Sequence, residues 1–322
     1  VHIFTTQKVK RQDNPLLNDP VFREFFGDQL PEQFSQGPNE NSLGSGVIVR
    51  ADGYILTNNH VIAQADQIIV ALNDGRRAEA EVIGTDPDTD LAVIKIELDK
   101  LPVLPFKLSG NEVGDVVLAI GNPFGVGQTV TQGIISATGR SDLGINTYED
   151  FIQTDAAINP GNSGGALIDV SGNLIGVNTA IFSQSGGSLG IGFAIPAKVC
   201  QQIMNAILKD GRVVRGWLGI SLLPPQRNDV MKPSEQGVTV AEVLPNGPSA
   251  QAGIQRGDKI IMVNDEQITS ASHLINYVAL QAPGSKIRIE VEREGKKQDL
   301  EVVVGERKQQ QNTSSQYIPL PE

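Results

Sequence analysis

Short runs of strand-forming residues recur between residues 44 and 192, and their frequency is the strongest constraint on the fold of this chain. Each run is rich in apolar and β-branched residues and is bounded by Gly, Asn or Asp, which is typical of strands. This pattern predicts an all-β barrel architecture. A helix is expected from Ala197 to Lys209, and Gly211 would end it. The expected strands are 46–49, 54–57, 67–72, 78–85, 91–96, 116–120, 132–138, 166–169 and 174–178.

Composition narrows the classes of function. The 322 residues are 39% hydrophobic, which is enough for a sizeable core and suggests two domains. The net charge of -11 argues against a nucleic-acid partner. The single cysteine, Cys200, excludes an intrachain disulfide, and its apolar neighbours favour a buried structural thiol. No Cys, His and acidic cluster has metal-ligand spacing, and residues 121–127 lack the lysine and helix of a phosphate site, so we predict no metal and no cofactor.

Ser163 is the candidate nucleophile. It stands between glycines in residues 159–165, directly before the apolar run 166–168, which suits a nucleophile on a tight exposed turn. Backbone N–H groups of Gly161, Asn162 and Ser163 would then form the oxyanion hole. Taken alone, the same string is also typical of a polar turn between two strands.

His60 is the candidate base, because the short apolar strand 54–57 runs directly towards it and histidine suits proton transfer near neutral pH. Only three histidines occur in the chain. His2 lies near the start and His273 lies in an expected helix far downstream. The alternative for His60 is an ordinary core or surface histidine.

Asp90 is the preferred acid, because it directly precedes the apolar strand 91–96, where a partly buried carboxylate could orient the imidazole. Asp86 and Asp88 are nearby alternatives, but they read as loop acids around Pro87. The order of the three candidates, with histidine first and serine last, is that of the chymotrypsin arrangement and not that of α/β-hydrolases or subtilisins.

Three separated motifs then point to one family. Residues 57–61 (TNNHV), 89–93 (TDLAV) and 161–165 (GNSGG) resemble the catalytic signatures of the HtrA (Deg) family of trypsin-like serine proteases. Residues 119–125, 131–136 and 190–196 extend the resemblance over nearly the whole chain. It implies a chymotrypsin-like double β-barrel and a serine endopeptidase with the triad His60, Asp90 and Ser163.

The resemblance also implies where a substrate would lie. A peptide would add as a strand beside residues 178–181, with its primary pocket near residues 157–159 and the loop 182–189. No acid stands where a trypsin-like pocket needs one, so a small or medium aliphatic side chain is expected there. The expected substrate-binding residues are Ile158, Asn159, Thr179, Ala180 and Ile181.

The protease domain is expected over residues 1–210 and is followed by a linker at 211–216. The composition of the chain changes at Trp217, where a second domain is expected to begin. Its segments 217–220, 237–240, 247–254, 257–261 and the helix 270–281 resemble one PDZ domain over 217–306, followed by a tail at 307–322 that we expect to be disordered. A glycine-containing loop that leads into a strand can present N–H groups to a terminal carboxylate, although a structural β-turn is the alternative. The expected peptide-binding residues are Leu218, Gly219, Ile220, Leu274 and Val278.

Residues 13–42 read as a long loop, yet Phe22, Phe25 and Phe26 are concentrated within it. These rings either fold back onto the same domain or contact another subunit. The resemblance favours the second alternative, because it implies a homotrimer held by N-terminal aromatic residues.

One PDZ domain implies the regulatory branch of the family, the DegS/AlgW type. Such proteases sense C-terminal peptides of misfolded outer-membrane proteins and cleave a membrane-bound anti-sigma factor in an envelope-stress response. In this branch Arg140, at the mouth of the loop 141–148, would relay the PDZ signal to an oxyanion turn in which the Asn162 N–H is misdirected at rest. The alternative for Arg140 is a solvated loop residue.

The chain begins at Val1 without methionine, and the resemblance leads us to expect an N-terminal inner-membrane anchor or export signal that is absent here, with the protein in the periplasm. Two other functions stay open. One is a general periplasmic quality-control protease or chaperone, and the other is a PDZ scaffold with a vestigial triad.

Overall fold

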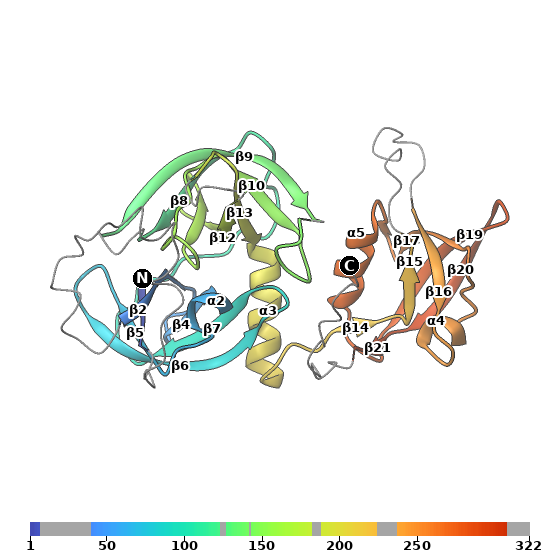
Figure 1. Ribbon diagram of the computed structural model, residues 1–322, viewed down its shortest axis with the longest axis horizontal. Coiled ribbons are helices and arrows are strands. Elements are labelled where there is room, and N and C mark those ends of the chain that lie inside the picture. Colours follow the sequence, from blue (N-terminus) through green and yellow to red (C-terminus); the bar gives the residue numbers. More distant parts are fainter. Residues whose placement is uncertain (7–39, 123–126, 142, 182–187, 224–236, 308–322) are drawn as a thin grey trace, which may run out of the picture. The chain divides into compact units, whose positions relative to one another are not determined.

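The computed structural model describes residues 1–6, 40–122, 127–141, 143–181, 188–223 and 237–307. They belong to two compact units, Val1–Val213 and Val214–Glu322, which we treat separately (Figure 1). None of the described helices is long and apolar enough to span a membrane.

The first unit begins with a seven-stranded antiparallel sheet, ordered β2-β1-β5-β6-β7-β4-β3. Alternating residues of its strands bury one apolar face, which includes Ile3, Ile55, Val70 and Ile94. Strands β2 and β3 at the two ends of this order are separated only by Gly46. The strands are β1 (His2–Thr6), β2 (Glu40–Ser45), β3 (Val47–Ile48), β4 (Tyr54–Asn58), β5 (Gln67–Ala71), β6 (Arg77–Asp86) and β7 (Leu91–Ile96), with the short helix α2 (Asn59–Ile62) after β4.

The second sheet of the first unit closes into a six-stranded barrel, β10-β13-β12-β11-β8-β9. Its interior holds Val117, Ile135, Leu167 and Ile175, each almost fully buried. The strands are β8 (Val116–Gly121), β9 (Thr129–Arg140), β10 (Phe151–Thr154), β11 (Ala166–Asp169), β12 (Leu174–Ile181) and β13 (Gly192–Pro196).

Helix α3 (Ala197–Asp210) follows the barrel and packs against β6, β7, β12 and β13. Its residues Cys200, Ile203, Met204 and Ile207 recur at helical spacing and are buried in one core cluster. Gly211 adopts φ 69°, a left-handed conformation that favours glycine, and its N–H donates to the carbonyl of Ile207. The predicted helix and its stop are confirmed.

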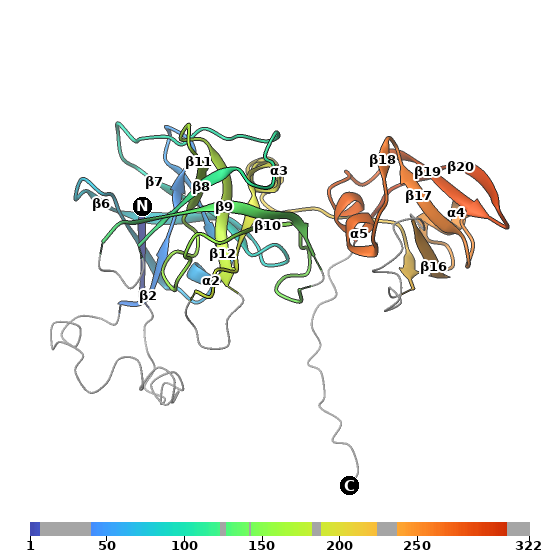
Figure 2. The ribbon, with the colours of Figure 1, turned by 90° about the horizontal axis from the view of Figure 1, so that it is seen from above.

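The second unit is a small sheet covered by helices (Figure 2). Its main sheet has six strands, five of them in the order β15-β16-β17-β19-β20 and the sixth, β18, paired with β17. Within the described residues β15 is an edge strand with no strand neighbour on its outer side. The elements are β14 (Gly216–Trp217), β15 (Ile220–Leu222), β16 (Val238–Val243), α4 (Pro248–Gln251), β17 (Lys259–Val263), β18 (Glu266–Gln267), α5 (Ala271–Ala279), β19 (Lys286–Arg293), β20 (Lys296–Val303) and β21 (Gly305–Glu306).

The predicted fold class is confirmed, but several boundaries differ. Strand β9 starts at Thr129 and runs to Arg140, and strands β10 and β13 were not among the predicted strands. Both missed strands are short, and β10 pairs with β9 on one side and with β13 on the other. The expected loop 13–42 ends too late, because residues 40–45 form β2, and the expected linker 211–216 already includes the first residue of β14. The rest of that loop and nearly all of the expected tail lie outside the described residues.

Candidate active site

The nucleophile candidate Ser163 lies on a turn between β10 and β11 that packs tightly against the first sheet. Gly161 and Gly164 adopt φ values of 99° and 82°, which residues other than glycine rarely adopt. A Cβ atom on Gly164 would stand 2.1 Å from the carbonyl oxygen of Ser45. The turn therefore needs glycine both for its conformation and for its close approach to the backbone of the other sheet.

His60 and Asp90 form a hydrogen-bonded pair. The Nδ1 atom of His60 lies 2.7 Å from Oδ2 of Asp90, and the backbone N–H of His60 donates to Oδ1 at 2.9 Å. The pair forms because β4 and β7 are neighbours in register, Asn58 opposite Leu91, so α2 and the residue before β7 meet at the same end of the sheet. Asp90 adopts φ 59°, an unusual conformation for a residue with a side chain, and strain of this kind clusters at functional sites.

The alternatives to this pair are engaged elsewhere. The carboxylate of Asp86 accepts a hydrogen bond from the hydroxyl of Thr89, and His2 lies beside the side chain of Asn122. His273 lies 3.5 Å from Glu266 in the second unit. The structure brings only His60 and Asp90 together among the weighed histidines and acids.

Thr179 connects this pair to the nucleophile. Its hydroxyl donates to Oδ2 of Asp90 at 3.0 Å, and its carbonyl accepts from the hydroxyl of Ser163 at 3.2 Å. The residue lies at a β-bulge in β12, which re-aims a side chain out of the regular alternation. Because the Ser163 hydroxyl donates to the carbonyl of Thr179 here, it must turn away from that carbonyl before it can donate to His60.

The expected oxyanion hole is only partly supported. The N–H of Asn162 donates to the carbonyl of Asn159 at 3.0 Å, so it is not free to bind an oxyanion in this conformation. The N–H groups of Gly164 and Gly165 also have acceptors, since they donate to the carbonyls of Asn178 and Asn162. Within residues 161–165, the N–H groups of Gly161 and Ser163 are the two for which no acceptor is found among the described residues.

Some of the expected substrate-binding residues lie at an accessible strand edge, and others are buried or lie beside residues that the structure does not describe. Strand β11 pairs with β12 only as far as Val177, so one edge of residues 179–181 has no strand neighbour within the described part of the chain. This edge fits a peptide that adds as a strand. Ile158 is 2% exposed and packs into the barrel core, so a substrate can reach little of it. Asn159 accepts the N–H of Ser188, while most of the expected pocket loop, residues 182–187, lies outside the described residues.

The candidate peptide site of the second unit lies where β14 leads into β15. Gly219 adopts φ 72°, and the carbonyls of Leu218 and Gly219 are held by the N–H groups of Ser249 and Leu244 at 3.0 and 2.8 Å. Ile220 begins the edge strand β15. Leu274 and Val278 are only 2% and 5% exposed and belong to the core of the unit, so their place in a peptide pocket stays a prediction.

Arg140 ends β9 opposite Phe151, and its Nε donates to the side chain of Gln153 at 2.8 Å. The loop that follows is tied to the segment before Asp90. The side-chain amide of Asn146 donates to the carbonyl of Thr89 at 3.1 Å, and the N–H of Tyr148 donates to that of Asp88 at 3.1 Å. A change in this loop can therefore reach the acid of the pair.

Sequence reasoning missed two contributors to this site. Glu149 binds three backbone N–H groups of the loop after Arg140, and Ser45 binds the nucleophile turn from the first sheet. The only signal for Glu149 in the sequence is an acid at the end of a polar loop, where it can accept backbone N–H groups. Ser45 gives no signal, because its partner Gly161 lies 116 positions away.

Comparisons with known proteins agree with this geometry. The family model of the trypsin-like peptidase domain matches residues 44–177, and that of the PDZ domain matches residues 216–304. The solved HtrA-type protease AlgW with a decapeptide is 52% identical, with a TM-score of 0.73, over 95% of this chain and 95% of that chain. The chain belongs to the HtrA family of serine endopeptidases. The predicted family is thereby confirmed.

Other HtrA relatives extend this picture. AlgW with a tripeptide is 56% identical, with a TM-score of 0.73, over 84% of this chain and 91% of that chain. Probable periplasmic serine endoproteases described as DegP-like are 46% identical over 299 residues in Pseudomonas putida (strain GB-1) and 45% identical over 302 residues in Chlamydia trachomatis serovar D. The two matches include 89% and 91% of this chain, but the chain spans only 62% and 60% of the relatives' own length.

Proposed function

We propose that the protein is a periplasmic serine endopeptidase in which Ser163 is the nucleophile, His60 the base and Asp90 the acid that orients the base. The 2.7 Å contact between His60 Nδ1 and Asp90 carries this proposal, because it fixes one ring nitrogen and leaves Nε2 for the serine proton. The names of the curated relatives support the periplasm.

The reaction follows from these positions. Ser163 Oγ attacks the substrate carbonyl while Nε2 of His60 takes its proton, and the N–H groups of Gly161 and Ser163 stabilise the oxyanion. His60 then gives the proton to the leaving amine, and water repeats the sequence to release the acyl group. Asp90, held by Thr179 and by the backbone of His60, keeps the imidazole in the required tautomer.

Alanine variants test these roles. Ser163→Ala and His60→Ala should each lower kcat by about 10⁴-fold or more, because the three groups act as a unit. Ser171→Ala, which changes an exposed serine beside β11, should leave the rate unchanged. A serine-directed phosphonate should label the parent protein at Ser163. Absence of labelling in the parent would favour the scaffold with a vestigial triad.

The second unit is proposed to bind C-terminal peptides of misfolded outer-membrane proteins and so to raise the protease rate towards a membrane-bound anti-sigma factor. The open edge of β15 and the left-handed Gly219 support peptide binding, and AlgW has been solved with two peptides. A peptide with a free carboxylate should activate cleavage of a defined membrane-protein segment, while its amidated form should not. Activation towards unfolded casein alone would favour a general quality-control protease.

Arg140 is proposed to take part in that activation. It lies at the start of the loop whose other contacts reach Thr89 and Asp88, and its guanidinium already holds Gln153 on the next strand. Arg140→Ala should reduce activation by peptide but leave the peptide affinity measured by fluorescence polarisation unchanged. Arg50→Ala is the matched control, since Arg50 is an exposed arginine of the same unit. Full activation of the Arg140 variant would remove it from the relay.

We also propose a homotrimer held by Phe22, Phe25 and Phe26 and an inner-membrane anchor preceding Val1. The aromatic segment lies outside the described residues, so the support is its concentration of three phenylalanines. Deletion of residues 13–36 should give monomers in analytical ultracentrifugation. An unchanged mass would return these rings to a role within one chain.

A further inference from the structure

Ser45, the last residue of β2, contacts the nucleophile turn at two points although it belongs to the other sheet. Its hydroxyl donates to the carbonyl of Gly161 at 2.7 Å, and its backbone N–H donates to the carbonyl of Ser163 at 2.9 Å. The side chain is buried, with 2% of the residue exposed. A buried hydroxyl that binds a carbonyl beside the oxyanion donors has a position from which it can set their direction.

The direction of the Ser163 N–H depends on the peptide groups on each side of it. The group between Gly161 and Asn162 is held at both ends, its carbonyl by the Ser45 hydroxyl and its N–H by the carbonyl of Asn159. The group between Ser163 and Gly164 is also held at both ends, by the N–H of Ser45 and by the carbonyl of Asn178.

The peptide group that carries the Ser163 N–H stands between these two. Its own carbonyl, that of Asn162, accepts the N–H of Gly165 at 2.9 Å. The Ser163 N–H is therefore the one group of these three peptide units for which no partner is found among the described residues. Loss of the Ser45 hydroxyl would release the carbonyl of Gly161. Gly161 has a φ of 99°, and because glycine has no Cβ its backbone can rotate once that carbonyl is released. The peptide group between Gly161 and Asn162 would then be held at one end only, by the carbonyl of Asn159, and the donors of Gly161 and Ser163 beside it would be less firmly directed.

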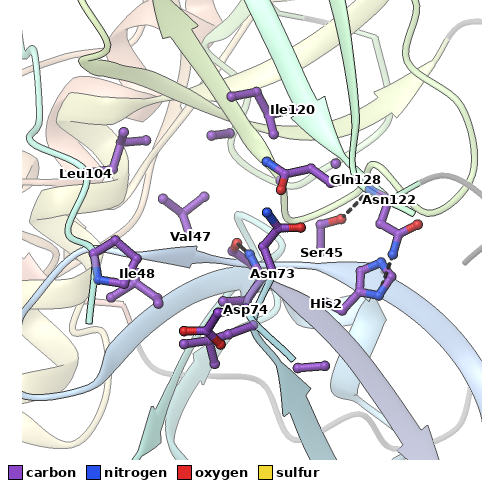
Figure 3. Close-up of a pocket in the computed structure, with 18 of the residues that line it drawn as sticks. His2, Ser45, Val47, Ile48, Asn73, Asp74, Leu104, Ile120, Asn122 and Gln128 are labelled. Atoms are coloured by element: carbon purple, nitrogen blue, oxygen red, sulfur yellow. Dashed lines mark hydrogen bonds between the residues drawn. The ribbon is translucent and has the colours of Figure 1, made fainter. Parts of the chain in front are cut away.

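A second contact fixes where the Ser45 proton points. The backbone N–H of Asn122 donates to Ser45 Oγ at 3.0 Å, as the dashed line in Figure 3 shows. With that lone pair occupied, the hydroxyl is free to give its proton to Gly161. Asn122 is itself held by the N–H of Gly127, and its side chain lies beside His2 in a cleft of about 850 Å³ between the two sheets (Figure 3).

We propose that Ser45 is a positioning residue for the oxyanion hole, which orders the N–H groups of Gly161 and Ser163 without touching the substrate. This inference rests on the proposed catalytic role of Ser163. A preorganised donor is effective because its orientation is set before charge develops on the substrate oxygen.

The main test is Ser45→Ala, assayed in the full chain with a fluorogenic peptide. Removal of a whole oxyanion donor costs about 10²–10³ in kcat, so loss of its orientation should lower kcat by about tenfold, while KM stays within about twofold. Ser45→Cys keeps a side chain of similar size with a weaker donor and should fall between serine and alanine. Thr154→Val, which removes another buried hydroxyl of the same unit, is the matched control and should leave kcat unchanged.

A binding measurement separates positioning from general damage. A peptide boronic acid forms a tetrahedral adduct with Ser163 that places an oxygen where the oxyanion develops, whereas the corresponding carboxylate product does not. Ser45→Ala should weaken the boronic acid by about the same tenfold factor and leave the product affinity unchanged. Equal weakening of both ligands, or an unchanged kcat in a folded variant, would overturn the proposal.

Two further outcomes are distinguishable. If Ser45→Ala does not fold, Ser45→Cys carries the same comparison of kcat and boronic-acid affinity. If the phosphonate fails to label Ser163 in the parent protein, the proposed function has failed. If the parent is labelled and the Ser45 variants match it in every measurement, only the positioning role has failed.

Discussion

Glu149→Gln should loosen the loop between β9 and β10 without unfolding the unit. The buried carboxylate of Glu149 accepts the N–H of Leu143 at 2.6 Å through one oxygen, and those of Ile145 and Asn146 at 2.5 and 3.0 Å through the other. Glutamine keeps one acceptor oxygen but replaces the other with an NH₂ group, which would face a backbone donor. The variant therefore loses one hydrogen bond outright and the charge that strengthens the other two.

The size of the effect follows from these contacts. Hydrogen bonds to charged groups contribute about 1.5–3 kcal/mol each, so loss of one and weakening of two should cost roughly 3 kcal/mol in the free energy of loop opening. Since each 1.4 kcal/mol is a factor of ten, amide exchange in the loop should accelerate by about 100-fold. Because Asn146 and Tyr148 hold the segment before Asp90, kcat should fall in the same variant.

Hydrogen exchange of a peptide covering residues 141–150, read by mass spectrometry beside a rate assay, measures both effects. Glu112→Gln is the matched control, because Glu112 is exposed on the surface of the same unit. Exchange in the Glu149 variant within about threefold of the parent would refute the reasoning, since a lost charged contact cannot leave so small a change.

Three further changes can be measured. Thr179→Val removes a hydrogen bond to the Asp90 carboxylate and should lower kcat/KM by about tenfold in a peptide assay. Arg293→Met leaves the buried carboxylate of Asp258 unpaired and should lower the free energy of unfolding of the second unit by about 3 kcal/mol at pH 7 in urea titrations. Burial favours neutral Asp258, but hydrogen bonds from Arg293 and the Gln255 N–H prevail and lower its pKa, so this loss should shrink as pH falls below about 4 and through the folded-state pKa. Burial raises the pKa of the Cys200 thiol, so iodoacetamide should label it at pH 8 only in urea.

The sequence predicted those parts of the molecule whose chemistry is local. A strand that runs towards His60, an acid directly before a strand and a serine among glycines each carry their signal within a few residues. The paired strands β4 and β7 bring the first two together. The helix of residues 197–210 was equally accessible, because its apolar spacing and its terminal glycine agree.

The remaining features depend on contacts between distant segments. The N–H of Asn162 was expected to bind an oxyanion in the active form and to point away from it at rest, but only the folded turn shows which carbonyl it meets, that of Asn159. Thr179 was expected on a substrate strand, and the bulge that turns its hydroxyl towards Asp90 has no signature in the sequence. Leu274 and Val278 have the helical spacing of a groove wall, but the same spacing also suits a core, and sequence alone could not show that both side chains are buried in the core cluster.

The corner at Ser45 and Gly46, where β2 ends and β3 begins, bears on when a newly made chain can become active. The serine turn belongs to the later barrel, whereas His60 and Ser45, which braces the turn at two points, belong to the earlier sheet. A chain that has folded only one half therefore holds no working combination of nucleophile, base and braced turn. Because the site needs both sheets, we expect the protease to cleave neither itself nor other chains before the barrel has closed.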